Sequence, residues 1–294
     1  MRLHLVDGTY ELFRAHFSGR PPHTAPQGWD AKATVGVVWS LLALVQDEAE
    51  AVTHIAVAFD NPIVSFRNDL FPFYKSDEGV PPELRNQFDP VEEGVAALGI
   101  TVWSMRDYEA DDALATGARK FRDQVDQVRI LTPDKDLGQC LQGDRVVQVD
   151  RLRGKLIDEA AFRALRGIAP SSMPDFLALT GDTADGIPGL AGFGEKSAAA
   201  VLAAYPHLEQ IPTFAHQWTV RPRGAVNLAT TFAAHREEAL LYRRLATLVD
   251  DVPLRESLDD LRFTGVPRAE FEAWCEKIGA GALKSAPKKW RPDA

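Results

Sequence analysis

The chain has 294 residues, of which 45% are hydrophobic and 26% charged, and this composition is typical of a soluble globular protein. No apolar run approaches the roughly 20 residues of a membrane span, and two distant cysteines, Cys140 and Cys275, argue against a disulfide framework and for a reducing cytoplasm. The net charge of −9 argues against nucleic-acid binding, unless the acidic side chains are concentrated in a metal site and a local basic stripe remains.

The first 60 residues predict two buried strands with helices between them. Residues 3–8 form a short apolar strand that becomes polar too soon for a signal peptide and carries Asp7 near its end. Residues 54–60 form a second apolar strand, which ends at Asp60. Two buried strands that each end in an aspartate indicate an α/β sheet with a site at its carboxyl edge. The expected helices span residues 9–17 and 33–51, on either side of a loop rich in Pro and Gly.

The alternation of strands and helices continues to about residue 157. Apolar residues between 84 and 98 recur at helical spacing, with an interruption expected near Pro90. Further strands are expected over residues 100–103, 128–132 and 145–149, and a helix over 109–121, so the sheet should be mostly parallel. Beyond residue 157 the pattern is helical, with a loop and helix over 181–205, a helix over 236–248 and a loose basic tail from residue 284.

Acidic side chains gather where these strands and helices begin or end. Glu109, Asp111 and Asp112 lie within four residues of one another, and two like charges 4 Å apart repel by roughly 1 kcal/mol even in water. Such a cluster indicates a bound cation. Oxygen-only ligands in this number favour two Mg²⁺ or Mn²⁺ ions over zinc. The candidate ligands are Asp7, Asp60, Glu109, Asp111, Asp112, Asp134, Asp136, Asp182 and Asp185.

Helix geometry separates the members of the 109–112 cluster. Glu109 and Asp112 are neighbours at i and i+3 on a helix, whereas Asp111 points elsewhere. We therefore expect Glu109 just before the helix proper, and Asp112 to act from behind the ligands or through water. Each acidic motif alone is equally typical of a turn, a helix cap or a solvated loop. Their repeated placement at strand ends is what favours a shared site.

Seven motifs carry a family resemblance, and they span roughly residues 3 to 205, with weaker likeness to about residue 250. They are Val6-Asp7-Gly8, Phe59-Asp60, Ser65-Phe66-Arg67, Tyr74-Lys75, Tyr108-Glu109-Ala110-Asp111-Asp112, Ile130-Leu131-Thr132-Pro133-Asp134-Lys135-Asp136, and Leu179-Thr180-Gly181-Asp182 through Gly194-Glu195-Lys196. In this order they resemble the bacterial 5′-3′ exonucleases of the flap endonuclease family, which include the amino-terminal nuclease domain of DNA polymerase I.

The resemblance implies a domain organisation and an activity. It implies a PIN-like α/β nuclease domain over residues 1–172 with an arch at about 67–99, a helical DNA-binding domain with a helix-turn-helix over 173–275, and a basic tail over 276–294. It implies cleavage of DNA at 5′ flaps and 5′ ends, in replication and repair, by a stand-alone nuclease without a polymerase domain. We favour a cytoplasmic monomer without contact to a membrane.

The resemblance also assigns the acidic residues to two ions. One ion is implied at Asp7, Asp60, Glu109 and Asp111, with Asp112 adjacent. A second is implied near Asp134, Asp136, Asp182 and Asp185.

Basic residues of the implied arch and helix-turn-helix would bind DNA. Arg67 and Lys75 match basic arch residues, and we expect them to act in catalysis with Asp134 and Asp136, with Lys75 stabilising charge on the phosphate. Glu78 stands where the family usually has an arginine and should weaken binding or catalysis, unless Arg85 substitutes. The glycines of the 189–197 loop let backbone N–H groups approach phosphates, and the family often binds K⁺ there. The candidate DNA-binding residues are Arg14, Arg67, Lys75, Arg85, Gly192, Gly194, Lys196 and Ser197.

Three other functions fit parts of the sequence. A PIN-like ribonuclease fits the acidic residues, although the helical unit suits duplex DNA. A DNA-binding protein of the same fold with weakened or lost catalysis fits Glu78, although every expected acid is present. A metal-dependent phosphatase would need an aspartate motif that is not apparent near Asp7. We favour hydrolysis of DNA phosphodiesters by a two-metal mechanism, as a 5′-3′ exonuclease and 5′-flap endonuclease.

Overall fold

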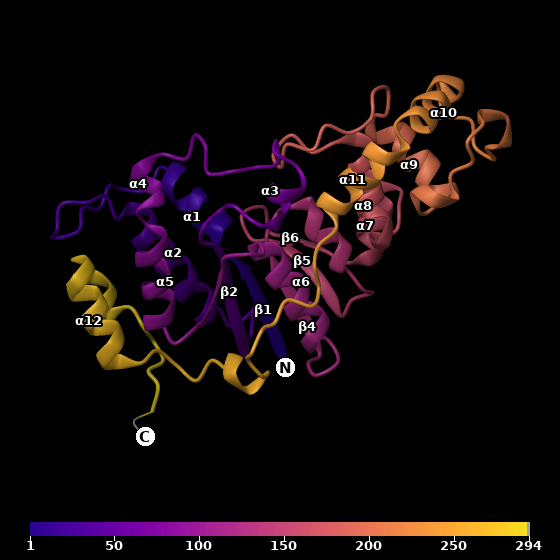
Figure 1. Ribbon diagram of the computed structural model, residues 1–294. Coiled ribbons are helices and arrows are strands. Elements are labelled where there is room, and N and C mark those ends of the chain that lie inside the picture. The colour runs from indigo at the N-terminus through magenta and orange to yellow at the C-terminus, as the bar shows by residue number, and fades with distance from the viewer. Residues whose placement is uncertain (293–294) are drawn as a thin grey trace. The chain divides into compact units, whose positions relative to one another are not determined.

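The computed structural model describes residues 1–292, and these divide into two compact units built from interleaved segments of the chain (Figure 1). Unit 1 comprises residues 1–64, residues 77–132 and the chain from residue 250 onward. Unit 2 comprises residues 65–76 and 133–249. No helix within residues 1–292 combines the length and the apolar character that a membrane crossing needs.

The strands form a mostly parallel sheet with the order β3-β2-β1-β4-β5-β6. In unit 1, β1 pairs in parallel with both β2 and β4, and β2 pairs in parallel with β3. In unit 2, β5 and β6 are antiparallel. The strand bounds are β1 Arg2–Asp7, β2 His54–Asp60, β3 Thr101–Met105, β4 Gln127–Leu131, β5 Val146–Asp150 and β6 Lys155–Ile157.

The strand order reverses between β1 and β4, and this reversal decides where a site can form. The chain moves outward from β1 to β2 and β3, and then returns past β1 to β4. Because parallel crossovers are right-handed, the returning connection lies on the opposite face of the sheet from the earlier ones. A crevice opens outside the carboxyl ends of the strands at such a point. Asp7 at the end of β1 lies at this reversal.

Helices cover both faces of the parallel strands in unit 1. The helix α6 packs across β1, β2, β3 and β4, whereas α1 and α5 pack on β2, with α2 against both of them and α12 against α5 (Figure 1). The strands are buried between these layers, and β2 is buried along its whole length. The helix bounds are α1 Gly8–Phe17, α2 Lys32–Val45, α4 Pro82–Arg85, α5 Phe88–Ala97, α6 Ala110–Phe121 and α12 Arg268–Ile278, with the 3₁₀ helices η5 Asp259–Leu261 and η6 Gly281–Ser285.

Unit 2 is largely helical and has its own hydrophobic core. The helix α8 packs against α9 and α11, and the core between them contains Phe162, Phe176, Leu177 and Trp218. The helix bounds are α3 Phe66–Leu70, α7 Glu159–Arg166, α8 Met173–Thr180, α9 Glu195–Ala204, α10 Ala225–Ala234 and α11 Arg236–Ala246. The 3₁₀ helices are η1 Lys135–Cys140, η2 Pro170–Ser172, η3 Leu208–Gln210 and η4 Ala215–Gln217.

The α/β class, the mostly parallel sheet and the C-terminal helical region expected from the sequence are confirmed. Some helix ends differ from the expectation. The second helix ends at Val45 rather than near residue 51. The interruption expected near Pro90 falls at Asn86 and Gln87 instead. Pro90 lies within the first turn of α5, where a missing N–H costs nothing because that N–H has no helical partner.

The C-terminal residues differ most from the expectation. The tail was expected to be loose, but the backbone of Val266 bonds to Lys289 and Arg291, and Arg268 lies 4.0 Å over the ring of Trp290. By contacts within the structure, residues 250–275 group with unit 1, whereas the second family match extends to residue 269, so the expected boundary at residue 275 stays a prediction. The last two residues of the expected tail, 293–294, lie outside the described part of the chain. Apolar and aromatic contacts of α12 and Trp290 fix this region, and a count of its basic charges could not reveal them.

Candidate metal centre

Asp7 and Asp60 lie at the carboxyl ends of neighbouring strands in unit 1, and each carboxylate is fixed by hydrogen bonds. Asp7 caps α1, because its Oδ1 accepts from the backbone N–H of Tyr10 at 2.8 Å, while its Oδ2 accepts from Thr132 Oγ1 at 2.9 Å. Asp60 Oδ1 accepts from the backbone N–H of Ala110 at 2.7 Å. This bond ties the end of β2 to the first turn of α6. Both aspartates are buried.

Glu109 and Asp112 form a capping box at the start of α6. Glu109 is the N-cap residue, and its backbone N–H donates to Asp112 Oδ2 at 3.0 Å. The expectation that Glu109 lies just before the helix proper is therefore confirmed. Asp112 is fully buried behind Glu109, and Asp111 is half-buried in the same turn. The N–H groups and dipole of the helix start favour this gathering of negative charge.

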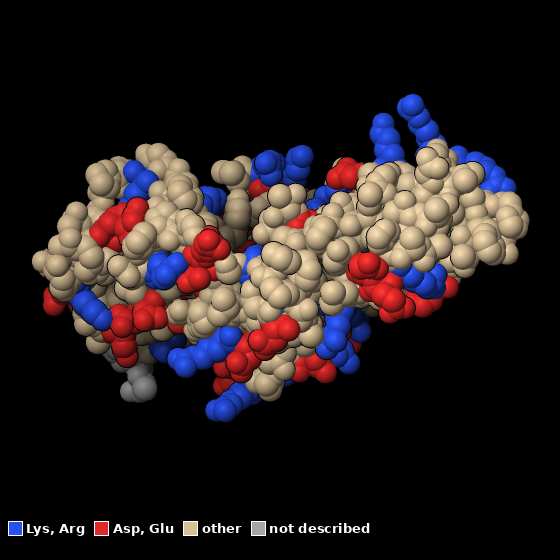
Figure 2. All heavy atoms as spheres, turned by 45° about the horizontal axis from the view of Figure 1, so that its top comes forward, with Lys and Arg blue, Asp and Glu red and all other residues tan. Residues whose placement is uncertain are grey.

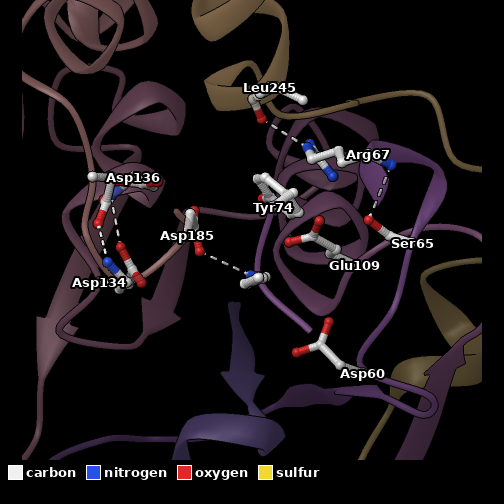
Figure 3. A network of polar contacts seen from close by, with 12 residues as sticks. Asp60, Ser65, Arg67, Tyr74, Glu109, Asp134, Asp136, Asp185 and Leu245 are labelled. Carbon is white, nitrogen blue, oxygen red and sulfur yellow. Dashed lines mark hydrogen bonds and ion pairs between the residues drawn. The ribbon is translucent and has the colours of Figure 1, made fainter. Parts of the chain in front are cut away.

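The structure thus brings Asp7, Asp60 and Glu109 to one edge of the unit 1 sheet. In Figure 3 the carboxylates of Asp60 and Glu109 point in the same direction from adjacent backbone segments. The hydrogen bonds from Tyr10, Thr132 and Ala110 use some of the oxygen lone pairs of Asp7 and Asp60. The other lone pairs of these carboxylates can still accept a donor or bind a cation.

In unit 2, Asp134 and Asp136 are set by the turn that opens η1. Asp134 is the N-cap residue of η1, and its Oδ1 accepts from the backbone N–H of Asp136 at 2.9 Å (Figure 3). The carbonyl of Asp134 accepts from the Gln148 amide on β5. Asp134 is exposed and Asp136 is buried, so the two carboxylates of this motif have different environments.

Asp182 and Asp185 lie in a tight loop closed by two backbone hydrogen bonds of 2.8 Å between Asp182 and Ile187. Asp182 Oδ1 also accepts from the Ala184 N–H at 2.9 Å. Gly186 has φ +73, and a Cβ there would lie 2.2 Å from the carbonyl oxygen of Phe73. Only glycine therefore allows this loop to lie against the 73–75 backbone. The contact places Asp185 beside Lys75, with 3.0 Å between the Lys75 N and the Asp185 carbonyl oxygen.

Asp136, Asp182 and Asp185 form a compact acidic cluster. Each contributes one carboxylate oxygen, and these three atoms all lie within 4.8 Å of one another. Among the described residues, Asp136 Oδ1 is buried without a hydrogen-bond partner. Burial, and then the charges of Asp134 and Asp185, raise the pKa of Asp136 well above its usual range. A buried acceptor of this kind costs free energy unless a cation satisfies it.

Two lysine ammonium groups lie against the cluster. Lys135 forms an ion pair with Asp182 and lies 3.9 Å from Asp136 Oδ1. Lys75 lies 3.3 Å from Asp185 Oδ1. Burial lowers the pKa of Lys135, but its hydrogen bond to Asp182 and the charges of Asp136, Asp182 and Asp134 outweigh burial, and the net pKa is raised.

The donor set fits a divalent metal ion. The ligands are carboxylate oxygens, the atoms that Mg²⁺ and Mn²⁺ prefer. The unsatisfied Asp136 Oδ1 and the close approach of three carboxylates are features that a cation would stabilise. The nine predicted acids therefore occur as two sets, one in each unit. Within residues 1–292, three acids of the unit 2 set have oxygen atoms close enough together to hold one metal ion.

Arg67, which the sequence predicts to contact DNA, is buried in the structure. Only 1% of its surface is exposed. Its Nε donates to the Leu245 carbonyl at 2.8 Å (Figure 3). Its NH2 group donates to the Thr247 carbonyl at 2.9 Å. The guanidinium also lies 4.7 Å over the Phe66 ring. Arg67 thus joins α3 to the end of α11.

The other predicted basic residues are partly engaged with acids. Arg14 pairs with Glu11, and Arg85 lies 3.1 Å from the carboxylate of Asp77. Arg85 is half-exposed and also donates to the Asp77 carbonyl. Glu78, which stands where the family usually has an arginine, directly follows Asp77, the residue that pairs with Arg85.

The predicted helix-turn-helix loop is exposed where phosphate contacts were expected. Gly194 is the N-cap residue of α9, and its backbone N–H donates to Ser197 Oγ at 3.0 Å. Gly192 has φ +89, a conformation that favours glycine. Gly192, Gly194 and Lys196 are exposed, whereas Phe193 between the two glycines is buried and anchors the loop.

Sequence reasoning missed Lys135, Thr132 and Gln148, which hold or balance the acidic side chains. Lys135 was visible between two aspartates in the motif, so its position was a usable signal. Thr132, which directly follows β4, lies within the 130–136 motif, but its hydrogen bond to Asp7 joins residues far apart in the sequence. Gln148 bonds to the Asp134 carbonyl, and no motif contains Gln148.

Comparisons with known proteins agree with this fold. Residues 2–166 match the family model described as 5′-3′ exonuclease, N-terminal resolvase-like domain, and residues 168–269 match the one described as 5′-3′ exonuclease, C-terminal SAM fold. The protein is therefore a two-domain protein, in which a resolvase-like α/β domain is followed by a SAM-like helical domain. The chain belongs to the 5′-3′ exonuclease family.

Curated relatives are larger proteins. The chain is 35% identical over 275 residues to DNA polymerase I of Pseudomonas aeruginosa, which covers 90% of this chain and 29% of that protein. It is also 35% identical over 267 residues to DNA polymerase I of Mycobacterium tuberculosis, covering 88% of this chain and 28% of that protein. The chain thus spans less than a third of the length of these relatives.

Solved structures share the fold at low sequence identity. A bacteriophage T5 5′-exonuclease with bound zinc ions has a TM-score of 0.65 and 17% identity, and the match covers 95% of this chain and 99% of that one. The catalytic core of Rad2 in complex with DNA substrate has a TM-score of 0.61 and 15% identity, with 96% and 90% coverage. Divalent metal ions are therefore bound in proteins of this fold.

Proposed function

We propose that this protein hydrolyses phosphodiester bonds of DNA, as a 5′-3′ exonuclease and a 5′-flap endonuclease. The observation that carries the proposal is the buried cluster of Asp136, Asp182 and Asp185, whose unsatisfied oxygen is suited to a divalent cation. Membership of the 5′-3′ exonuclease family supports the same activity. We further propose domains at 1–172, 173–275 and 276–294 and a cytoplasmic, monomeric protein.

Two Mg²⁺ or Mn²⁺ ions are proposed as cofactors, one for each acidic set. Asp7, Asp60, Glu109 and Asp111 would hold one ion, and Asp134, Asp136, Asp182 and Asp185 would hold the other. When bound, such ions supply an activated water and neutralise charge on the leaving oxygen. Asp112 would act only by holding the Glu109 backbone, as its hydrogen bond at 3.0 Å indicates.

The lysines beside the unit 2 cluster have a role that the geometry supports. Lys135 and Lys75 form ion pairs with Asp182 and Asp185. A divalent ion would take over this neutralisation, which leaves Lys75 able to donate to an oxygen of the scissile phosphate. Lys75 is therefore proposed as a catalytic residue, whereas Arg67 is proposed to position α3.

The DNA partner is proposed to be duplex DNA with a 5′ flap or a 5′ end. A T5 flap endonuclease and the catalytic core of Rad2, which share this fold, have been solved in complexes with DNA. This chain has an exposed glycine loop before α9 that suits phosphate contacts and a K⁺ ion. Such contacts carry little sequence information, so recognition would depend on shape. Binding should also weaken steeply as salt concentration rises.

The deciding experiment is cleavage of a 5′-flap duplex with and without Mg²⁺. We expect cleavage only with the metal, and its loss in D136N and D182N. Asp251→Asn, which changes an exposed aspartate outside both acidic sets, should cleave like the wild type. Intact flap DNA beside cleaved single-stranded RNA would instead support a ribonuclease, and cleavage by D136N at the wild-type rate would remove the proposed role of the cluster.

A further inference from the structure

We propose that η4 and α10 of unit 2 form a second DNA site, which stacks an unpaired nucleobase on Phe214 and His216. The ligand class, single-stranded DNA, rests on the proposed function, but the site itself rests on the following contacts. We call this surface the stacking platform and define it by Phe214, His216, Val226 and Arg223.

Two rings at the start of η4 form an exposed stacked pair. The ring centroids of Phe214 and His216 are 5.7 Å apart and the ring planes differ by only 15°. Phe214 is 59% exposed and Val226 on α10 is 70% exposed. Parallel rings offer an outer π-face to a third flat ring, and such stacking is how proteins hold unpaired bases without reading their sequence.

The platform is held rigidly by its own segment. Arg221 donates through NH1 to the carbonyls of Ala215 at 2.5 Å and Trp218 at 2.6 Å. Trp218 is buried, and its indole N–H donates to the Pro212 carbonyl at 2.7 Å. Both ends of the turn that carries Phe214 and His216 are therefore fixed before any ligand binds, which lowers the entropic cost of binding.

A groove of about 610 Å³ lies beside the rings. Phe214, His216 and Val226 line it, together with the small residues Ala229 and Ala233 of α10. This volume lies within the range of sites that bind small molecules. The small alanine side chains leave room for a flat base beside the rings.

Residues 211–236 carry basic but no acidic side chains, and this charge favours a polyanion such as DNA over a protein partner. The chain has 42 acidic residues in 294, so a stretch of 26 residues should hold about four (26 × 42/294). Residues 211–236 hold none, but contain three arginines and two histidines. Arg223 is exposed, and within residues 1–292 it makes no ion pair. Its guanidinium is therefore available for a phosphate.

The platform adjoins the loop proposed to bind phosphates. A Cβ at Gly192 would lie 3.6 Å from Leu228 of α10, so the 189–197 loop and α10 are neighbours within unit 2. In Figure 2 the region that carries α9 and α10, at the right, is a broad uncharged surface with basic side chains projecting from its upper edge. A strand bound at the loop would continue onto this surface.

The first test is fluorescence anisotropy of the full chain in EDTA, where the proposed cleavage cannot occur. The probes are a blunt duplex and the same duplex with a single-stranded extension. F214A should weaken binding of the extended probe by about 5- to 150-fold and leave the blunt probe within about two-fold of the wild type. F214W should restore binding, because tryptophan offers a π-face. L165A, which changes another exposed apolar side chain of unit 2, should have no effect.

Two further measurements separate stacking from general electrostatics. R223A should reduce the slope of log affinity against log salt by about 0.7 for the extended probe. An extension that contains 5-iodouracil should crosslink to Phe214 or His216 on illumination. Equal loss of both probes in F214A, or unchanged binding with crosslinks only elsewhere, would overturn the proposal. Because cleavage is measured separately with Mg²⁺, failure of the platform leaves the nuclease result intact, and failure of the nuclease leaves the binding result readable.

Discussion

Arg67→Ala separates a structural role from a DNA contact. The substitution removes the donors to the Leu245 and Thr247 carbonyls, which lie at 2.8 and 2.9 Å. The Leu245 carbonyl is buried and would be left unsatisfied, at a cost of about 1–3 kcal/mol. The Thr247 carbonyl is only partly buried, so water can replace part of its lost bond. Loss of the contact between the Arg67 guanidinium and the Phe66 ring adds to these terms.

The total expected loss in the free energy of unfolding is about 3 kcal/mol. For a protein of this size it corresponds to a fall in melting temperature on the order of 10 °C. Far-UV circular dichroism during heating measures it directly. Arg85→Ala is the matched control, because its ion pair with Asp77 is half-exposed and should contribute at most about 1 kcal/mol.

The opposite pattern would refute this reasoning. If Arg67→Ala melts like the wild type but binds flap DNA much more weakly, Arg67 is a DNA contact. Its burial in the structure would then describe a state that DNA displaces. Loss of both properties in parallel would be explained by unfolding alone, and a lower temperature at which the variant is folded would recover DNA binding.

The remaining predictions concern metal, capping and pH. Mg²⁺ or Mn²⁺ at about 100 times its dissociation constant should stabilise the wild type by about 2.7 kcal/mol, and thermal shift assays should show a smaller gain for D136N. Asp112→Ala should destabilise α6 by about 1–2 kcal/mol and weaken metal binding about 10- to 100-fold, whereas unchanged calorimetric affinity would show that Asp112 does not support Glu109. The hydrogen bond from His4, with Arg129, lowers the pKa of Glu50 to about 2, so stability present above the unfolded value of 4.5 is lost as pH falls towards 2. Burial lowers the pKa of His4. The protein therefore also loses stability as the pH falls and His4 must become protonated. E50Q should therefore show a shallower decline of melting temperature between pH 4.5 and 2, and an identical decline would contradict the assignment.

Local patterns predicted those features that depend on neighbours in sequence. The strand at His54–Asp60 was expected with its observed bounds, because a continuous apolar run ends at a single aspartate. Glu109 was expected before its helix from the i, i+3 relation with Asp112. The strand β6 was missed, because it has three residues and is mostly exposed.

Contacts between distant residues were beyond such patterns. The carbonyls that bury Arg67 lie 178 and 180 residues away, and no sequence motif marks a backbone oxygen as an acceptor. Trp290 packs with Arg268 and Phe271 although its own segment is basic. In the candidate site, the acid identities were visible in sequence, but the cluster of Asp136 with Asp182 and Asp185 depends on Gly186 lying against the Phe73 backbone.

The interleaved segments of the two units constrain how the chain can fold during synthesis. Unit 1 contains both the first strand and Trp290, whose ring lies against Arg268, so this unit is assembled from segments that are far apart in the sequence. All segments of unit 2 are available once residue 249 has emerged, so unit 2 can complete its core while unit 1 still lacks α12. A fragment cut at residue 269, where the second family match ends, would remove all but the first residues of α12 and the Trp290 contact. Such a fragment should retain the unit 2 core but expose the surface of α5 that α12 covers.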